Sequence, residues 1–475
     1  MFEQQLSKVI FDYKWEQGGG DGLDPHMVHL LKEKYKKAIM ACVSTRATKP
    51  FLKYNSLSSF VEVVPRILGE GGEAIIMEGR VHWDRVPNRL LLRIRSHEIA
   101  EEQGKTIDKV AKSTYKQARE ELEKLRGLAK KKEKERLLER IMNRFEKDKC
   151  AVRLPHSHKP QTKRGGRAQI YIGKNTEGLL CFLDHGKTKD RKDIYVTELI
   201  EEIVDPEKIK DEFTLDKIVG IMIKATRGVK ALHENNIWHR DIKPANIFVD
   251  KKGRAYIGDH GIIRAYNIME NGVDLMQSYR TMDDVKKGEI LVFGTPEYIS
   301  PEGAYGLHLL CKESDIYMLA GTFYEWLTGI PPNQPASGRN GTDMVQNVRR
   351  YENKTRIIRP SRLIQEPGIE GVELVIAHGL QPYPQHRPIA EEMLTDLQYI
   401  KSGTNAFYAI REASEYGKLQ EIETLRHNQA IMESEGKKGQ AKFVQQDIDR
   451  IATMSQVNED KLDIYIEAFK QTIYH

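Results

Sequence analysis

The sequence contains only four cysteines in 475 residues, and they lie far apart at Cys42, Cys150, Cys181 and Cys311. They form no Cys-x-x-Cys pair and no Cys/His spacing that would suit a zinc site. This pattern excludes a disulfide framework and favours free thiols in a reducing compartment.

The sequence also lacks the signals that direct a chain into a membrane. Its first six residues contain no basic region followed by an apolar core. No uncharged apolar run reaches the ~18 residues that a spanning helix needs. We therefore expect a cytoplasmic protein without a membrane span. A delivery signal other than a cleaved leader would leave no trace in these patterns.

Charge of one sign is not in large excess, since 75 basic residues face 69 acidic residues and the net charge is +6. This excess gives mild attraction to polyanions but does not by itself indicate nucleic-acid recognition. Hydrophobic residues make up 39% and charged residues 30% of the chain, which is typical of a globular protein with exposed helices.

The most informative stretch runs from residue 237 to residue 261. It contains His-Arg-Asp ending at Asp241, then Lys243, Asn246 and an Asp-His-Gly triplet that begins at Asp259. In this order the stretch resembles the catalytic and metal-binding loops of the protein kinase family. The lysine at position 243 makes it similar to the serine/threonine kinases. The resemblance implies an α+β, two-lobed fold with a small β-rich lobe and a larger helical lobe.

The resemblance also implies a role for each of these side chains. Asp241 would accept the proton of a substrate hydroxyl, and Lys243 would place a cation beside the transferred phosphoryl group. Asn246 and Asp259 offer the hard oxygen ligands that Mg²⁺ takes when it is bound to ATP phosphates.

Further motifs follow in the order expected of this family. Residues 294–302 resemble the end of an activation segment, in which Thr295 would bridge the catalytic side chains and Glu302 would pair with Arg387. Asp315 would hold the catalytic loop from beneath. The alternative is that Glu302 and Arg387 form an ordinary surface salt bridge and that Asp315 is an ordinary acid at the N-terminus of a helix. Such residues would contribute little to stability.

A glycine-rich segment lies upstream, at Gly69, Gly71 and Gly72, with apolar residues through Ile76 after it. It resembles the loop that covers nucleotide phosphates, where glycine lets backbone N–H groups approach the ligand. Ala74 replaces the usual third glycine. A tight hairpin turn would explain the same segment equally well.

Residues 89–95 read as the strand on which the family carries its phosphate-binding lysine. No lysine occurs between positions 69 and 104, so Arg93 is the best match and Leu91 takes the place of a small alanine. In a strand, Arg95 would point to the same side as Arg93, so it is the second candidate for the lysine position. Arginine is not a conservative replacement here, because its planar fork differs from a compact ammonium group.

The cation needs a carboxylate on the following helix. Glu121 is the first candidate and Glu120 the second, because Leu122 and Leu125 mark the inward face at helical spacing. The alternative is that both are ordinary solvated helix acids.

The segment at 195–199 resembles the hinge between the two lobes. Thr197 would line the adenine pocket, and the backbone of Glu198 and Leu199 would hydrogen-bond the base. An ordinary buried strand end is the alternative interpretation.

The segment between positions 259 and 302 is long for this family and contains Ser278 and Thr281. We predict that one of them is autophosphorylated and that Arg240 pairs with the phosphate. Alternatively, Asp283 or Asp284 already supplies the negative charge.

The chain divides into four expected parts. These are an N-terminal extension (1–58), a small lobe (59–200) with a charged helical insertion at about 126–149, a large lobe (201–402) and a C-terminal helical module (403–475). The insertion has apolar residues at helical spacing, which predicts an amphipathic helix packed on its own lobe.

Two functions remain after this reading. The first is a serine/threonine protein kinase that uses ATP and Mg²⁺ to phosphorylate protein substrates. The second is a pseudokinase that acts as a nucleotide-responsive binding module. In either case the C-terminal module or the charged helix could recruit a protein partner.

Overall fold

A computed structural model of the chain describes most of the residues after position 59. The described residues are 60–70, 74–103, 112–143, 145, 148–155, 177–187, 193–235, 237–258, 264–265, 269–270, 273–274, 296–305, 310–333, 357–453 and 459–474. The expected N-terminal extension lies outside them. The chain forms two compact units. The first comprises residues up to 203 together with 231–239 and 258–279, and the second comprises 204–230, 240–257 and residues from 280 onward.

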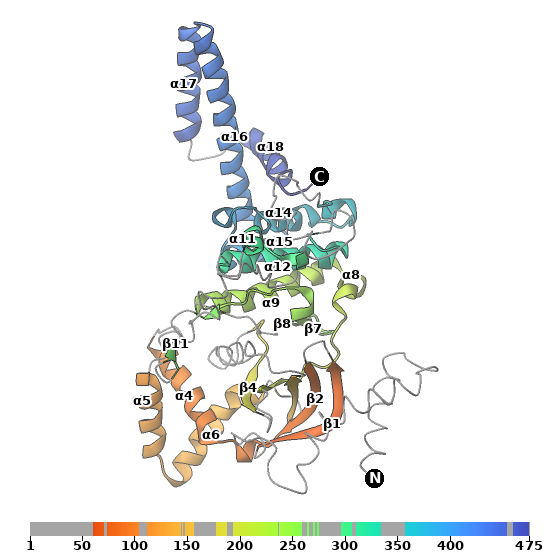
Figure 1. Cartoon of the computed structure of the whole chain (residues 1–475), viewed down its shortest axis with the longest axis vertical. Helices are drawn as coiled ribbons and strands as arrows, with labels where there is room; N and C mark the ends of the chain where they lie inside the picture. The colour runs from red at the N-terminus through yellow and green to blue at the C-terminus, as the bar shows by residue number, and fades with distance from the viewer. Residues whose placement is uncertain are drawn as a thin grey trace, which may run out of the picture. The chain divides into compact units, whose positions relative to one another are not determined.

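The first unit is built on a five-stranded antiparallel sheet (Figure 1). In spatial order its strands are β1 (Val61–Glu70), β2 (Ala74–Val81), β3 (Lys149–Pro155), β5 (Asp193–Glu198) and β4 (Phe182–Lys187). Alternation along the strands separates a buried face from a second face, since Val152 pairs with Met77 and Val196 and all three are almost inaccessible.

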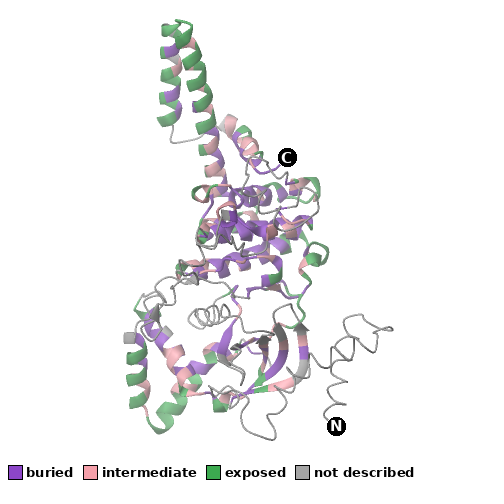
Figure 2. Ribbon diagram, viewed as in Figure 1, coloured by how far each residue is buried: buried purple, intermediate pink, exposed green. Residues whose placement is uncertain are grey.

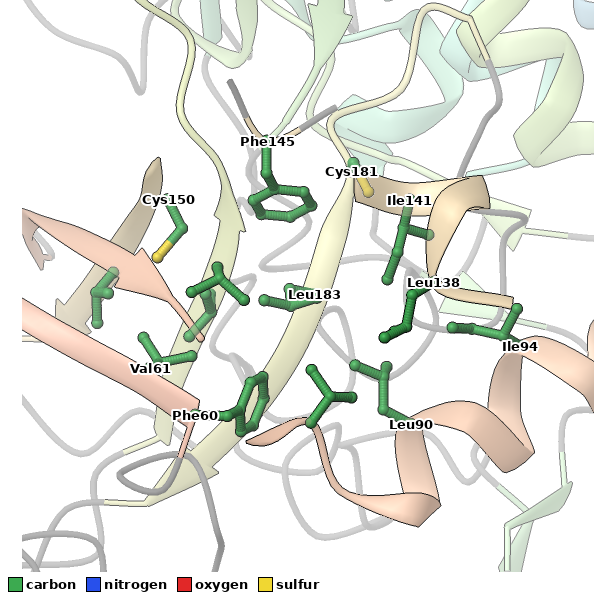
Figure 3. Close-up of a cluster of buried hydrophobic side chains, with 14 of the residues drawn as sticks. Phe60, Val61, Leu90, Ile94, Leu138, Ile141, Phe145, Cys150, Cys181 and Leu183 are labelled. Atoms are coloured by element: carbon green, nitrogen blue, oxygen red, sulfur yellow. The ribbon is translucent and has the colours of Figure 1, made fainter. Parts of the chain in front are cut away.

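Three helices lie in the chain between β2 and β3. They are α4 (Asn88–Glu102), α5 (Lys112–Lys124) and α6 (Gly127–Met142). Leu90 and Ile94 of α4 and Leu138 and Ile141 of α6 pack with Leu183 of the sheet in one apolar cluster (Figure 3). Helices α4 and α6 therefore supply six of the nineteen buried residues of this cluster.

The expected strand at residues 89–95 is wrong, because these residues form the first half of α4. Leu90, Leu91 and Ile94 are buried, and their spacing places them on one face of a helix. A short run of apolar and basic residues fits both the strand and the helix period, so the local pattern could not separate them.

The charged helix α6 has the amphipathic character that its sequence predicts. Leu137, Leu138 and Ile141 are buried, whereas Lys130 and Lys131 are exposed. The apolar stripe packs within the first unit, as we expected from the helical spacing.

Buried ion pairs join α6 to α4. Glu98 is 6% exposed and accepts hydrogen bonds from Arg136 at 2.7 and 2.8 Å and from Arg95 at 3.0 Å. Burial alone would raise the pKa of Glu98, but the hydrogen bonds from Arg136 and Arg95 outweigh burial and lower it.

In its described residues, the second unit has helices and one short strand pair, β7 (Ile247–Val249) and β8 (Ala255–Ile257). Its longer helices are most of α9 (Leu215–Glu234), then α12 (Lys312–Thr328), α14 (Ile369–Gly379), α15 (Ala390–Lys401), α16 (Phe407–Ser434), α17 (Lys438–Thr453) and α18 (Glu459–Lys470). Nearly all of α12 from Ser314 onward is buried, and it packs on α14 (Figure 2). Among the described helices, none is both long enough and apolar enough to cross a bilayer.

The last three helices belong to the second unit. The pair α16 and α17 forms a hairpin whose outer end is exposed, whereas α18 returns to pack on α16 and α14 (Figures 1 and 2). Lys470 Nζ lies 3.1 Å from Glu373 Oε1 in a buried ion pair, and the Tyr474 hydroxyl donates to the Glu373 carbonyl at 2.8 Å. The predicted C-terminal module therefore ends in a segment that packs on the large helical unit.

A buried histidine at this junction gives a prediction for pH dependence. Burial lowers the pKa of His378, next to Phe469 of α18, to about 3, with smaller contributions from Arg411 and His386. The imidazole is therefore neutral when folded but titrates near 6.5 when unfolded. Its contribution to stability is complete above pH 6.5, and as the pH falls from there towards 3 it is lost at about 1.4 kcal/mol per pH unit.

The His378→Leu variant should remove this part of the acid sensitivity. Urea unfolding at pH 7.5 and pH 5.0 would measure it, with exposed His427→Leu as the control. A wild-type difference between the two pH values that persists unchanged in His378→Leu would contradict the assignment.

Candidate functional site

The His-Arg-Asp loop lies between β6 (Ile237–Trp238) and the short helix η6 (Pro244–Asn246). Lys243 Nζ lies 3.2 Å from Asp241 Oδ2. The Asn246 amide donates to the same carboxylate oxygen at 3.0 Å and to the Asp241 carbonyl at 2.7 Å. Three of the predicted site residues are thus brought together around one half-buried carboxylate.

The backbone of this loop takes an unusual turn at Arg240. Its φ is 71°, a left-handed conformation that costs a non-glycine residue about 1–2 kcal/mol. Asp315, fully buried at the start of α12, accepts the Arg240 backbone N–H at 2.7 Å. The structure thus contains the contact that we predicted for Asp315, a carboxylate that holds the loop backbone from beneath.

Replacing this carboxylate should loosen the loop. In Asp315→Ala the Arg240 N–H loses its acceptor, and we expect a cost of about 1–3 kcal/mol because the site is fully buried. Hydrogen exchange measured by mass spectrometry should rise in peptides that cover residues 237–249.

Asp396→Ala is a matched control, because the Asp396 carboxylate also accepts backbone N–H groups, those of Phe407, Tyr408 and Ala409. Its loss should raise exchange at the start of α16 and leave the loop unchanged. Wild-type exchange of the loop in Asp315→Ala would contradict the prediction.

Glu302 and Arg387 form the ion pair that the sequence predicts. The two guanidinium nitrogens Nη1 and Nη2 donate to Glu302 Oε1 and Oε2 at 2.7 and 2.9 Å, and the Arg387 side chain is fully buried. Burial would raise the pKa of Glu302, but the hydrogen bonds and charge of Arg387 outweigh it and lower the pKa. This pair ties the short helix α11 (Pro301–Tyr305) to the loop before α15.

His239 contacts the backbone just before Asp259, the predicted metal ligand. Its side chain is fully buried, and Nε2 donates to the Gly258 carbonyl at 2.9 Å. Trp238 pairs with Arg264 in the short ladder of β6 and β9 (Arg264–Ala265). The segment on either side of Asp259 is therefore anchored beside the strand that leads into the loop.

The chemistry of Asn246 fits a hard cation. Its amide nitrogen is committed to Asp241, which leaves the carboxamide oxygen as the ligand atom, and magnesium prefers oxygen ligands. The second expected ligand, Asp259, lies outside the described residues. No group of three or more potential metal-ligating side chains (His, Cys, Asp or Glu) occurs within the described part of the chain.

The glycine-rich segment spans the end of β1 and the connection to β2. Gly69 pairs with Ile76 and Glu70 with Ile75, so the segment closes an antiparallel hairpin. Gly71 and Gly72 lie outside the described residues. Ile76 is half-buried on β2. The hairpin fits both interpretations of the sequence, a tight turn and a phosphate-covering loop.

The structure does not place Arg93 where we expected it. Arg93 is on helix α4, and its Nη2 donates to Asp184 Oδ1 at 2.8 Å, while Arg89 binds the other oxygen at 2.6 Å. Asp184 on β4 is 1% exposed, so the two arginines neutralise a buried carboxylate and join α4 to the sheet. Leu91 is buried in the apolar core of the first unit.

The predicted pairing of Arg93 with Glu121 is also wrong. Glu121 on α5 accepts a hydrogen bond from Arg95 Nε at 2.8 Å, and Glu120 is exposed. Arg95 donates to Glu98 and Glu102 as well. These residues form a network that holds the inserted helices together.

Sequence reasoning missed the residue that does occupy the third strand. On β3, Cys150-Ala-Val-Arg153 places a basic side chain two residues after a small alanine. This spacing resembles the Val-Ala-Ile-Lys pattern of the kinase strand, with arginine in place of lysine. Ala151 pairs with Thr197 and Arg153 with Tyr195 of β5, on the face opposite Val152. The Ala-x-basic spacing was the available signal, and it lies 60 residues beyond Arg93.

The expected hinge is the end of β5. The Glu198 N–H donates to the Cys181 carbonyl at 2.9 Å, and the Glu198 carboxylate accepts the Cys181 N–H at 2.6 Å. This backbone N–H is thus engaged within the first unit, and the predicted contacts of the Glu198 and Leu199 backbone with a base stay a prediction. The Glu198 carbonyl accepts the Thr197 hydroxyl at 3.0 Å, and Leu199 is half-buried.

Four further candidates lie outside the described residues. Asp259 has been noted above, and the others are Ser278, Thr281 and Thr295. Their roles remain predictions from the sequence. The thiol expectation is tested in part, because none of the described cysteines, Cys150, Cys181 and Cys311, forms a disulfide.

Comparison with known proteins agrees with this geometry. Residues 182–399 match the family model described as "Protein kinase domain". The chain is 29% identical over 214 residues to the serine/threonine-protein kinase PknB of Mycobacterium tuberculosis, which covers 43% of this chain and 30% of that protein. It is 34% identical over 120 residues to a probable PknB of Corynebacterium glutamicum, covering 25% of this chain and 16% of the relative.

The matched region spans less than a third of the length of these relatives. It begins at β4 and includes the His-Arg-Asp loop, Asp315 and the Glu302–Arg387 pair. The fold is α+β, with a β-rich unit and a helical unit. In motif, geometry and sequence, residues 182–399 are thus similar to the protein kinase domain.

Proposed function

We propose that the protein is a serine/threonine protein kinase that transfers the γ-phosphoryl group of ATP to protein hydroxyl groups. The observation that carries this proposal is the arrangement of Lys243 and Asn246 around the Asp241 carboxylate. A surface turn has no need for a lysine and an amide on one carboxylate, whereas in-line transfer to a hydroxyl needs all three groups.

The loop residues divide the work of the reaction. Asp241 accepts the proton of the attacking hydroxyl on its carboxylate and orients the oxygen towards the phosphorus. Lys243, next to that carboxylate, contributes a cation to the equatorial phosphoryl oxygens. The carboxamide oxygen of Asn246 and the carboxylate of Asp259 would hold magnesium. When bound, the metal neutralises the phosphate charge that develops during transfer.

The positioning residues act through the loop and not on the substrate. Asp315 fixes the Arg240 turn, which sets the direction of the Asp241 side chain. In the first unit, Arg153 on β3 is the cation that we assign to the nucleotide phosphates, in place of Arg93. Thr295 would bridge Asp241 and Lys243.

Regulation is part of the same proposal. Ser278 or Thr281 would be autophosphorylated and would pair with Arg240, which would order the activation segment. The exposed face of α6 and the outer end of the α16–α17 hairpin are the surfaces on which we would look for a protein partner.

A second candidate function rests on one observation. Arg153 replaces the lysine of the kinase strand, and arginine presents a planar fork where the family has a compact ammonium group. This substitution favours a pseudokinase that responds to nucleotide without transferring phosphate.

Phosphate transfer from radiolabelled ATP distinguishes the two functions. The purified chain would be incubated with Mg-ATP, alone and with a general acceptor protein, and labelled residues identified after hydrolysis. We expect phosphoserine and phosphothreonine. A folded protein that binds Mg-ATP but incorporates no phosphate in either reaction would instead be the binding module.

A further inference from the structure

The cation on β3 needs a carboxylate to orient it, and the usual source is absent. In the kinase template that carboxylate is on a helix, where it pairs with the strand-borne cation. Residues 156–181, which connect β3 to β4, contain one acidic residue, Glu177. Glu177 is exposed and lies only five residues before β4. The sequence after β3 therefore offers no helix-borne glutamate.

The acids of α4, and Glu121 of α5, are engaged with other arginines. Within the described part of α4, α5 and α6, Glu98, Glu102 and Glu121 all bind Arg95 at 2.7–3.0 Å. Glu101 binds Arg140 at 3.1 Å. These helices cover the face of the sheet that carries Val152, which is the face opposite Arg153. The carboxylate for Arg153 has to come from the other face.

Strand register places Glu78 of β2 on that face, together with Glu62 of β1 and Asp193 of β5. Glu78 of β2 pairs with Ala151, and Ile76 pairs with Arg153. Paired residues of an antiparallel ladder share a face, so Glu78 and Arg153 are diagonal neighbours on it. Diagonal Cβ atoms lie about 7–8 Å apart or less, which long side chains span.

The burial of Glu78 indicates that it has a cationic partner. The residue is 9% exposed, and a glutamate is rarely so buried unless it is paired. Arg80 is the other basic residue on this face of β2, but it is exposed and opposes Glu62 of β1. Two described basic residues of β3 are diagonal to Glu78, Lys149 and the half-buried Arg153, and Lys149 Nζ lies 2.5 Å from Glu201 Oε1.

We infer that Glu78 on β2 is the carboxylate that orients the Arg153 guanidinium towards the nucleotide phosphates. The inference rests on the proposed function. The cation and the carboxylate then lie on two neighbouring strands, whereas the kinase template has them on a strand and a helix. The geometry is then set by the β2–β3 register, so formation of the pair needs no movement of a helix.

Arginine suits this arrangement better than lysine. Its fork has five donors in one plane, so one edge can bind the Glu78 carboxylate while another faces a phosphate. An ammonium group at the end of a lysine would have to share one point charge between the two. The replacement of lysine at position 153 and the placement of Glu78 thus have one physical explanation.

The test uses the full chain and two measurements, the dissociation constant of a fluorescent ATP analogue in the presence of Mg²⁺ and the kcat and KM of phosphate transfer. Glu78→Gln should weaken nucleotide binding roughly 10-fold to 100-fold, the range expected for loss of a charge-assisted hydrogen bond. Its KM for ATP should rise more than its kcat falls. Arg153→Gln should give a similar loss, and the double variant should be no worse than Arg153→Gln alone, because the two residues act as a pair.

Glu62→Gln is the matched control, since Glu62 is an exposed glutamate of the same sheet. It should bind nucleotide like the wild type. If Glu78→Gln does not fold, Glu78→Asp keeps the charge but shortens the reach, and it should fold and still raise the KM for ATP.

Three outcomes would overturn the inference. One is nucleotide binding within twofold of wild type in Glu78→Gln or Glu78→Asp, and another is multiplication of the two losses in the double variant. The third is a loss confined to Glu121→Gln, which would return the role to a helix. A folded wild type that binds no nucleotide would reject the proposed function together with the inference, whereas an active wild type with an unaffected Glu78→Gln would reject the inference alone.

Discussion

Asp241→Asn should reduce phosphate transfer by about 10²–10⁴-fold, the range typical of a lost general base. The substitution keeps the shape of the side chain, so the contacts with Lys243 and Asn246 lose charge but not volume. Binding of the ATP analogue should remain within a few-fold of wild type, because Asp241 acts on the hydroxyl and not on the nucleotide. The measurement is the initial rate of radiolabel incorporation beside the dissociation constant.

Asp216→Asn makes the same chemical change at a position without a role in the site. Asp216 is exposed on α9, where its side chain lies beside Lys401. An exposed ion pair contributes little, so both activity and stability should match the wild type. Equal rates in Asp241→Asn and Asp216→Asn would show that Asp241 is not the base.

The helical unit and its site were predictable because their signals are local. His239 to Asn246 is one short stretch, and the spacing of Asp241, Lys243 and Asn246 brings them around one carboxylate. The pairing of Glu302 with Arg387 joins distant residues. It was nevertheless predictable because both positions belong to motifs that the family resemblance identifies in sequence.

The β-rich unit could not be predicted to the same depth, because the insertion of α4, α5 and α6 separates β3 from β2. Residues 89–95 occupy the sequence position at which the third strand was expected, and their apolar and basic residues fit a strand as well as a helix. The decisive information is non-local. Arg89 and Arg93 are drawn to the buried carboxylate of Asp184, about 90 residues away in sequence, and this contact selects the helix. Arg153 became visible as the strand cation only when β3 was seen to pair with both β2 and β5.

Loss of Arg387 should give the largest destabilisation that we predict, about 3–5 kcal/mol for Arg387→Ala. The side chain is fully buried and all five of its N–H donors have acceptors. Two bind the carboxylate of Glu302, and three bind the carbonyls of Gln381, Pro382 and Glu313 at 2.6, 2.8 and 3.1 Å. The variant leaves a buried carboxylate without its cation, and that uncompensated charge is the main cause of the cost. Thermal unfolding followed by circular dichroism would measure the change.

A set of three further variants separates charge from packing. Arg411→Ala removes an exposed arginine, 3.7 Å from Glu392, and should cost less than about 1 kcal/mol. Arg387→Lys keeps the charge but supplies only three donors from one point, so it should recover part of the loss and not all of it. The double variant Arg387→Met with Glu302→Leu removes the carboxylate as well as the cation, and it should be more stable than Arg387→Ala because no charge is left buried alone. If the double variant were instead the less stable of the two, the destabilisation would come from lost packing around Tyr317, over whose ring the guanidinium lies at 4.9 Å, and not from the isolated carboxylate.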